Sequence, residues 1–391
     1  MGMIVNTIIV CDKSVYACPL HEPHGNPPGG WLPQRCLRYS VAECACEPRH
    51  QQEDEAMNTK NIWLAMITLC LLNSLAAAQQ PATGELPRTP DGKPDMQGIW
   101  TNATQTSLER PARFGDRRFM TAEEAQQMQQ DAQGREVAAD APSDPNRAPP
   151  SDGNTAAAYN TFWLDRGTQV TQIDGEYRTS MIIDPPDGRI PFRTDAPEQN
   201  FMEALRDIHG DEAFLGPEMT TIGERCLLFY DFRTSNSSAG PPMMPIIYNN
   251  NYQIVQTDAH VVIMAEMMHD ARILRLNSEH LPPEVYKWMG DSVAEWQGDT
   301  LVVNTRNMHP QQSHYGSGTG LQVTESFRMV SNDEIVYRFT MNDPVAYTQP
   351  WTAEMVLYRR PPADRIYEFA CHEGNYALPG ILAGARRLET Q

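Results

Sequence analysis

The stretch YEFACHEGNY near the end of the chain places Cys371, His372 and Glu373 side by side. A thiol next to an imidazole and a carboxylate could be a nucleophile, a metal site or one half of a disulfide. The folding compartment decides between these readings, because disulfides persist in oxidising compartments and are rare in the cytosol. The chemistry of this stretch therefore depends on whether the chain is exported.

The stretch EMMHDAR, residues 266–272, is a second group of reactive side chains. On a helix, Glu266 and His269 would share one face, as in di-iron bundles. The preceding Val-Val-Ile run favours a strand instead, and the chain after residue 78 holds no second E-x-x-H. We expect the strand to end near Glu266, with His269, Asp270 and Arg272 at the rim and the start of the next strand. Asp270 and Arg272 could also form an ordinary ion pair.

Glu325 is a carboxylate within an apolar strand pattern, LQVTESFRMV. Strand alternation puts it on one face with Leu321, Val323, Phe327 and Met329. Burial there would raise the pKa of the Glu325 carboxyl toward the range useful for proton transfer. A bulge that brings Glu325 to the surface, or a buried pair with an arginine, would remove that role.

Other candidates lie in loops that could form the rim of a ligand site. Trp288 and Asp291 lie in one such segment, and Trp351 begins another, where its ring could cover a ligand. The candidate catalytic residues are Glu325, His269, Asp270, His372 and Glu373, and the candidate ligand-binding residues are Glu266, Arg272, Trp288, Asp291, Trp351 and Tyr376.

The sequence leaves the cofactor and any metal unknown. His269, His372 and carboxylates could hold a metal ion, and the pair Met243–Met244 is compatible with copper. Most other methionines stand singly in strand patterns, where this side chain fills gaps in a core. The sequence has no phosphate-binding P-loop, no G-x-S-x-G elbow and no H-E-x-x-H motif.

Residues 57–78 have the three-part form of a secretory signal peptide. Lys60 gives a short basic front, the segment from Ile62 to Leu72 is apolar, and three alanines precede Gln79. The apolar segment is shorter than the roughly 20 residues that span a bilayer, which argues against a membrane anchor. Because a signal peptide begins a chain, we interpret residues 1–56 as a disordered upstream extension and Met57 as the start. The expected location is periplasmic or secreted.

The cysteines divide according to this start. Five of the eight precede residue 57, and their spacing with nearby histidines suggests a zinc module but fits a closed tetrahedral site poorly. Cys70 lies in the predicted signal. Cys226 and Cys371 remain, and a pair of cysteines in an exported protein favours a disulfide.

The charge of the chain narrows the partners. The formal net charge is −19, and no basic stripe is present, so binding to nucleic acid is not expected. After removal of the signal, stable insertion into a membrane is not expected either. The expected partner is a small hydrophobic or aromatic molecule.

The pattern of elements changes along the mature chain. Residues 79–166 form an extended and helical lead-in, with a strand at 98–101 and a helix at 121–133 that starts with the capping-box residues Thr121 and Glu124. Residues 167–391 carry about eleven short, often alternating strands, the last at 365–371, and a short helix at 199–208. Without crossover helices, these strands predict an antiparallel β-barrel or sandwich with a few short helices.

Several motifs give the chain a family resemblance: PDMQGIW, GERCL, YNNNYQIVQT, EMMHDAR, WQGDTLVVNT, VTESF, PWTAE and YEFACHEGNY. With them, residues 94–386 resemble a family of exported bacterial proteins to which no activity is assigned. The resemblance implies that residues 1–56 lie outside the family unit, and it transfers no catalytic residue. The series of strands is also similar to lipocalin-like barrels, at the level of the fold alone.

Two functions fit these observations. The first is an exported β-barrel enzyme, a hydrolase or a lyase/isomerase, that acts on a small apolar or aromatic molecule through carboxylate and histidine acid–base chemistry. The second is a binding protein or carrier that holds a hydrophobic ligand in the same barrel without turnover.

Overall fold

The computed structural model describes the backbone of residues 8–11 and 14–17, and residues 85–139, 164–195, 216–228, 240–246, 250–312 and 314–390. The chain forms two units, Met1–Gln79 and Gln80–Gln391. In the first, β1 (Ile8–Cys11) and β2 (Ser14–Ala17) form an antiparallel hairpin in a segment where the sequence predicts no order. The predicted signal peptide and the predicted helix at 199–208 lie outside the described residues.

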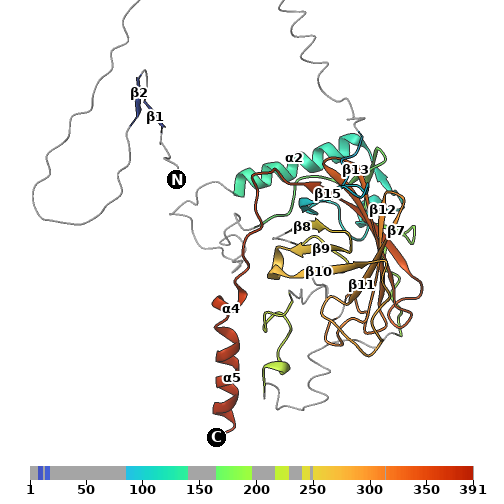
Figure 1. Ribbon diagram of the computed structural model, residues 1–391, viewed down its shortest axis with the longest axis vertical. Helices are drawn as coiled ribbons and strands as arrows, with labels where there is room; N and C mark the ends of the chain where they lie inside the picture. Colours follow the sequence, from blue (N-terminus) through green and yellow to red (C-terminus); the bar gives the residue numbers. More distant parts are fainter. Residues whose placement is uncertain are drawn as a thin grey trace, which may run out of the picture. The chain divides into compact units, whose positions relative to one another are not determined.

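The second unit is built around a closed barrel of nine strands (Figure 1). Around the barrel, β14, β13, β12, β11, β10, β9, β8, β3 and β15 follow one another, and β15 closes onto β14. The strands are β3 (Gly98–Thr101), β8 (Asn251–Gln256), β9 (His260–Ala265), β10 (Ala271–Leu276), β11 (Asp291–Gln297), β12 (Thr300–Arg306), β13 (Gln322–Ser331), β14 (Glu334–Asn342) and β15 (Trp351–Arg359). The predicted barrel is thus confirmed, as opposed to a sandwich.

The barrel is mixed rather than purely antiparallel. The pair β10–β11 is parallel, whereas the other neighbouring pairs are antiparallel. A parallel pair needs a connection that returns to the starting end of the sheet. Residues 277–290 make this return, so both β10 and β11 begin at the same end of the barrel.

Apolar side chains at alternate positions of the strands fill the interior of the barrel. In β14, Ile335, Tyr337, Phe339 and Met341 are fully buried, while Arg338 between them is exposed. Because successive side chains in a strand point to opposite faces, these apolar residues form the inner surface. The predicted alternation of this strand is confirmed.

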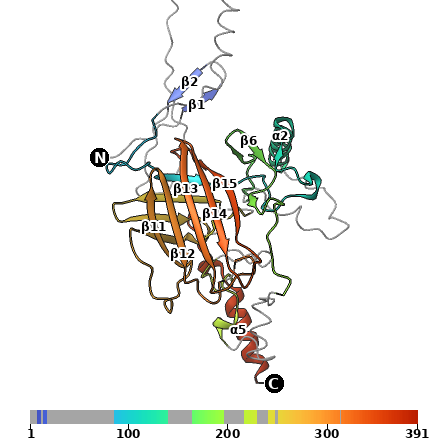
Figure 2. The ribbon, with the colours of Figure 1, turned by 90° about the vertical axis from the view of Figure 1, so that its right-hand side faces the viewer.

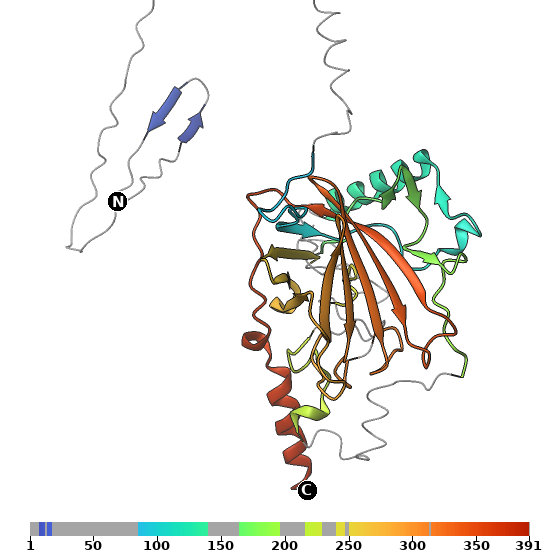
Figure 3. The ribbon, with the colours of Figure 1, turned by 45° about the vertical axis from the view of Figure 1, so that its right-hand side comes forward.

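The two ends of the barrel differ (Figure 3). Tight turns join β8 to β9, β11 to β12 and β13 to β14 at one end, and Gly298 takes the positive φ of 62° that the β11–β12 turn requires. Long connections gather at the other end, which we call the mouth. There the segment 240–244 is buried, and the backbone N–H of Met243 donates a hydrogen bond to the Tyr337 hydroxyl at 3.0 Å.

An outer layer covers part of the wall (Figure 2). It consists of α2 (Ala122–Ala139) and a small sheet of β4 (Phe119–Met120), β6 (Glu176–Arg178) and β5 (Gln172–Ile173). Ile173 packs on the outward side chains Val336 and Val356 of β14 and β15. The predicted capping box is present, because the Thr121 N–H donates to the Glu124 carboxylate at 2.8 Å and the Glu124 N–H donates to the Thr121 hydroxyl at 3.2 Å.

The structure differs from the sequence prediction at two segments. β3 is a barrel strand, so residues 79–166 are more than a lead-in. The predicted strand at 365–371 is wrong: residues 360–370 run without regular structure to α4 (Cys371–Gly374) and α5 (Ala377–Leu388), and Tyr367 is 73% exposed. The reason is that β15 is already paired on both edges, with β14 on one side and with β3 and β7 (Ile182–Asp184) on the other.

The remaining described helices are short 3₁₀ turns, η1 (Ala112–Phe114), η4 (Pro217–Met219) and η5 (Met267–His269). Among the described residues, no helix combines the length and apolar character that crossing a bilayer requires.

Candidate functional site

A buried ion pair lies inside the barrel. Arg272 of β10 reaches Glu325 of β13 with both ends of its guanidinium: Nη1 donates to Oε1 at 3.0 Å and Nη2 donates to Oε2 at 2.6 Å. The Tyr337 hydroxyl donates to the same Oε1 at 2.8 Å. The Arg272 and Glu325 side chains are 1% and 0% exposed. Of the roles left open by the sequence for Glu325, the structure selects the buried pair with an arginine.

The opposite charges of Arg272 and Glu325 stabilise each other inside the barrel. Burial by itself lowers the pKa of Arg272, but the Glu325 carboxylate opposite raises it above the ordinary arginine value. Because each charge is removed from water, the pair holds only while both partners stay in place. The proton-transfer role expected for Glu325 rested on burial alone, whereas the structure shows the buried pair with an arginine that the sequence left open as the alternative.

Further polar side chains surround the pair, and the sequence reading missed them. Arg272 Nη2 lies 3.5 Å from the Ser292 hydroxyl, which shares a 2.8 Å hydrogen bond with Thr305. His314 is fully buried, and burial together with the positive charge of Arg272 lowers its pKa to about 3. His314 is therefore neutral. Alternation could have found Tyr337, whereas His314 lies in a loop without any pattern.

Asp270 lies at the mouth, in the turn between β9 and β10 that leads to Arg272. Its carbonyl accepts a hydrogen bond from the Ala265 N–H at 2.8 Å, and Ala265 pairs with Tyr252 in the next strand. Asp270 has extended backbone angles and precedes Arg272 by two positions. It therefore shares the inward face of Arg272, in the row of Ala265 and Tyr252.

The Asp270 carboxyl is chemically unusual. Its Oδ2 atom is buried and has no hydrogen-bond partner among the described residues. Burial raises the pKa of Asp270 to about 6, although the nearby His269 acts to lower it. His269 itself is exposed, and both Met268 and His269 adopt positive φ, at 62° and 58°. The sequence predicted Asp270 and His269 at the rim, and the structure places both there.

Glu266 follows β9 and is buried, at 4% exposure. Asn251 Nδ2 donates to Glu266 Oε2 at 2.6 Å. Nearby, burial and the negative charge of Glu266 raise the pKa of Asp165, whereas Arg360 acts to lower it. These carboxylates come from different loops at the mouth, and Asp165 carried no sequence signal.

Two further candidates, Trp351 and Trp288, pack against the rings of other side chains. Trp351 is wrong as a rim residue, because it is 0% exposed and packs edge-on against Phe339, Tyr315 and Tyr347. Trp288 is half-buried and stacks on His309 with ring centroids 3.8 Å apart.

Asp291 is fully buried at the start of β11. Burial acts to raise the pKa of Asp291, but hydrogen bonds from Arg275, the Leu281 N–H and His280 outweigh it and lower the value to about 2. Asp291 thus anchors the connection 277–290, and its own partners occupy the carboxylate that the sequence assigned to a ligand.

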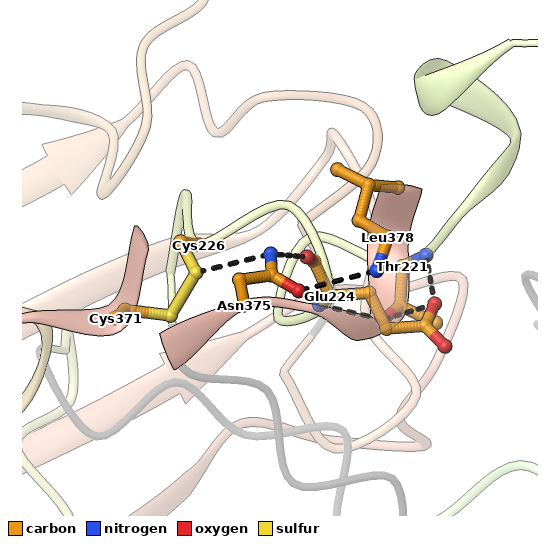
Figure 4. The surroundings of a disulfide bond; sticks show 6 residues. All are labelled: Thr221, Glu224, Cys226, Cys371, Asn375 and Leu378. Carbon is orange, nitrogen blue, oxygen red and sulfur yellow. Dashed lines mark hydrogen bonds between the residues drawn. A yellow bond between two sulfur atoms is a disulfide. The ribbon is translucent and has the colours of Figure 1, made fainter. Parts of the chain in front are cut away.

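The disulfide is confirmed (Figure 4). Cys226 and Cys371 are bonded with Cα atoms 5.8 Å apart and 145 positions apart in sequence. Beside the bond, Asn375 Nδ2 donates to the Glu224 carbonyl at 2.6 Å. Cys371 therefore forms a structural disulfide and is not a nucleophile.

The other members of this stretch do not join the network. His372 and Glu373 are exposed on α4, and neither side chain forms a hydrogen bond or ion pair with any described residue. Tyr376 is 83% exposed. Within the described residues, no group of three histidine, cysteine, aspartate or glutamate side chains is arranged to hold a metal ion.

The fold and these contacts define a β-barrel protein with a disulfide-stapled C-terminal segment and a polar network inside an apolar barrel. Comparison with models of protein families gives no match, and comparison with curated proteins gives none either.

Proposed function

We propose that the protein is an exported enzyme that acts on a small apolar or aromatic molecule, with Asp270 at the barrel mouth as the proton-transfer group. The observation that carries the proposal is the buried Oδ2, without a partner in the described part of the chain, of a carboxyl whose pKa is raised to about 6. A general acid or base works best when its pKa lies near the operating pH. An exported location and membership of the resembled bacterial family are part of this proposal.

The neighbours of Asp270 support a division of roles. Arg272, two positions further along the same face, is a fixed positive charge held by Glu325, and it favours negative charge that develops on a substrate. Ala265 and Tyr252, which share the row of Asp270, are buried and give it apolar and aromatic neighbours. These roles fit a hydrolase or a lyase/isomerase.

The test is Asp270→Asn, which keeps the shape of the side chain and removes the titrating group. We expect turnover of small aromatic and apolar substrates to fall by about 10²–10⁴-fold, while ligand binding is retained and the melting temperature does not fall. In the wild type, the rate should change through about pH 6. His372→Ala, on exposed α4, is the matched control and should leave turnover unchanged. Equal turnover in Asp270→Asn and the wild type contradicts the assignment.

A carrier without turnover is the second candidate, and one observation favours it. The Glu325 carboxylate, which the sequence offered for catalysis, is occupied by Arg272 and Tyr337. A carrier would bind members of the same substrate panel with similar affinity in the wild type and in Asp270→Asn, and would convert none of them.

A further inference from the structure

A pocket lies on the outside of the barrel, away from the mouth. It has a volume of about 380 Å³, is partly open to solvent, and lies between α2, the β5–β6 hairpin and the outward faces of β13, β14 and β15. Figure 2 shows α2 and β6 beside β14 and β15. Its size falls in the range of small-molecule sites.

The lining of this pocket carries acidic side chains and no basic one. Glu334 begins β14 and lies directly opposite Tyr358 of β15 in the strand register, so both side chains face the pocket. Among the described residues, Glu334 forms no ion pair and its carboxylate accepts no hydrogen bond. Burial and the negative charge of Asp333 raise the pKa of Glu334. A bound cation would relieve both effects.

The other groups of the pocket suit an organic cation. Tyr177 of β6 and Tyr358 of β15 line it, and Gln172 offers an amide oxygen, whereas Gln129 Oε1 already accepts a hydrogen bond from the Val170 N–H at 3.2 Å. Aromatic faces attract ammonium groups, most strongly where water is displaced. Asp174 at the edge is already 3.9 Å from Arg328, which leaves Glu334 as the carboxylate available to a ligand.

A metal ion fits this pocket less well. Hard cations take several carboxylate or carbonyl oxygens, whereas Asp174 lies beside Arg328, and no group of three acidic, histidine or cysteine side chains among the described residues is arranged to hold a metal ion. We infer that the outer pocket is a binding site for a small organic ammonium ion, held by Glu334 and by the rings of Tyr177 and Tyr358.

The test uses choline and its uncharged analogue of the same shape, 3,3-dimethylbutan-1-ol, in calorimetric titrations of the full chain. We expect wild-type protein to bind choline at least roughly tenfold more tightly than the alcohol, because only choline carries the charge. Glu334→Gln should abolish this preference, and Tyr177→Leu should weaken the binding of choline. Glu284→Gln, which removes the same charge from an exposed loop, should change nothing.

The comparison of the two probes needs no variant, so it stands even if a substitution disturbs folding. Equal binding of choline and the alcohol overturns the inference, as does the absence of choline binding. Unchanged choline affinity in a folded Glu334→Gln protein overturns the role of Glu334. These outcomes are independent of turnover at the mouth, so this site and the proposed function can fail separately.

Discussion

At the scale of single residues, two carboxylates of the same barrel have opposite surroundings. Glu325 is held by a bidentate arginine and a tyrosine, whereas the half-buried Asp270 has a buried oxygen without a partner among the described residues. A satisfied buried carboxylate is an anchor, and an unsatisfied one is costly to the fold and available for proton transfer. The two residues therefore make different predictions.

Breaking the buried pair should strongly destabilise the barrel. We expect Glu325→Gln and Arg272→Met each to lower the free energy of unfolding by about 3–5 kcal/mol, because each leaves its partner unpaired in the interior. The double variant should lose clearly less than the sum of the two. Urea unfolding of the four proteins measures this coupling. Additive losses would mean that the two charges do not depend on each other.

Asp270 should make stability depend on pH in the opposite sense to a salt-bridged aspartate. Its folded pKa of about 6 lies above the value near 3.9 of an unfolded chain, so the folded state binds the proton more tightly. Stability should therefore fall as the pH rises from about 4 to about 6 and change little above that.

Asp270→Asn should remove this slope and raise the free energy of unfolding at neutral pH by about 1–2 kcal/mol, a figure reduced because the side chain is partly exposed. Thermal unfolding of both proteins across this pH range is the measurement. A stabilised but inactive variant is typical of a functional residue. If the two proteins show the same pH dependence, Asp270 does not titrate in this window.

At the scale of elements, the C-terminal segment is attached to the barrel mainly by its staple. No residue from 361 to 390 is fully buried, and the described links between this segment and the loop 221–226 are the disulfide and the hydrogen bonds of Asn375 (Figure 4). A helix whose apolar face is only half-buried gains less stability from packing than one with a buried face. Its position thus depends largely on the covalent bond.

The double variant Cys226→Ser/Cys371→Ser should release this segment and leave the barrel folded. Hydrogen exchange of residues 372–390 should become fast, while β8 to β15 keep their protection. The free energy of unfolding should fall by about 2–5 kcal/mol, because the unfolded chain loses a long closed loop. Asn375→Ala, which keeps the disulfide, is the control. Protection of α5 that survives in the double variant would show that packing holds it.

At the scale of the whole molecule, the disulfide agrees with an exported protein, and the proposed route is through residues 57–78. Expressed from Met57 in a bacterial host, the protein should appear in the periplasm or medium with an intact mass that starts at Gln79 and lacks two hydrogens for the disulfide. Arginines in place of Leu64 and Leu69 should block export by interrupting the apolar segment. A cytoplasmic product that keeps residues 57–78 would contradict the proposal.

Local pattern in the sequence predicted much of this protein. Alternation identified most barrel strands, and the pairing of Cys226 with Cys371 followed from counting cysteines after the predicted signal. Glu325 could be placed inside because the residues at positions two apart are apolar. Side-chain periodicity and turn chemistry are local properties, so a single sequence carries them.

The partners of each residue were decided by the tertiary structure. Arg272 and Glu325 are 53 positions apart, and closure of the sheet brings them together. The same closure pairs both edges of β15, which leaves residues 365–371 without a strand to join. The strand that lies opposite a carboxylate decides its hydrogen-bond partners. Glu325 meets an arginine and a tyrosine, whereas Asp270 Oδ2 meets no partner among the described residues. Strand alternation gives the face of a side chain, whereas only the closed barrel determines what it meets there.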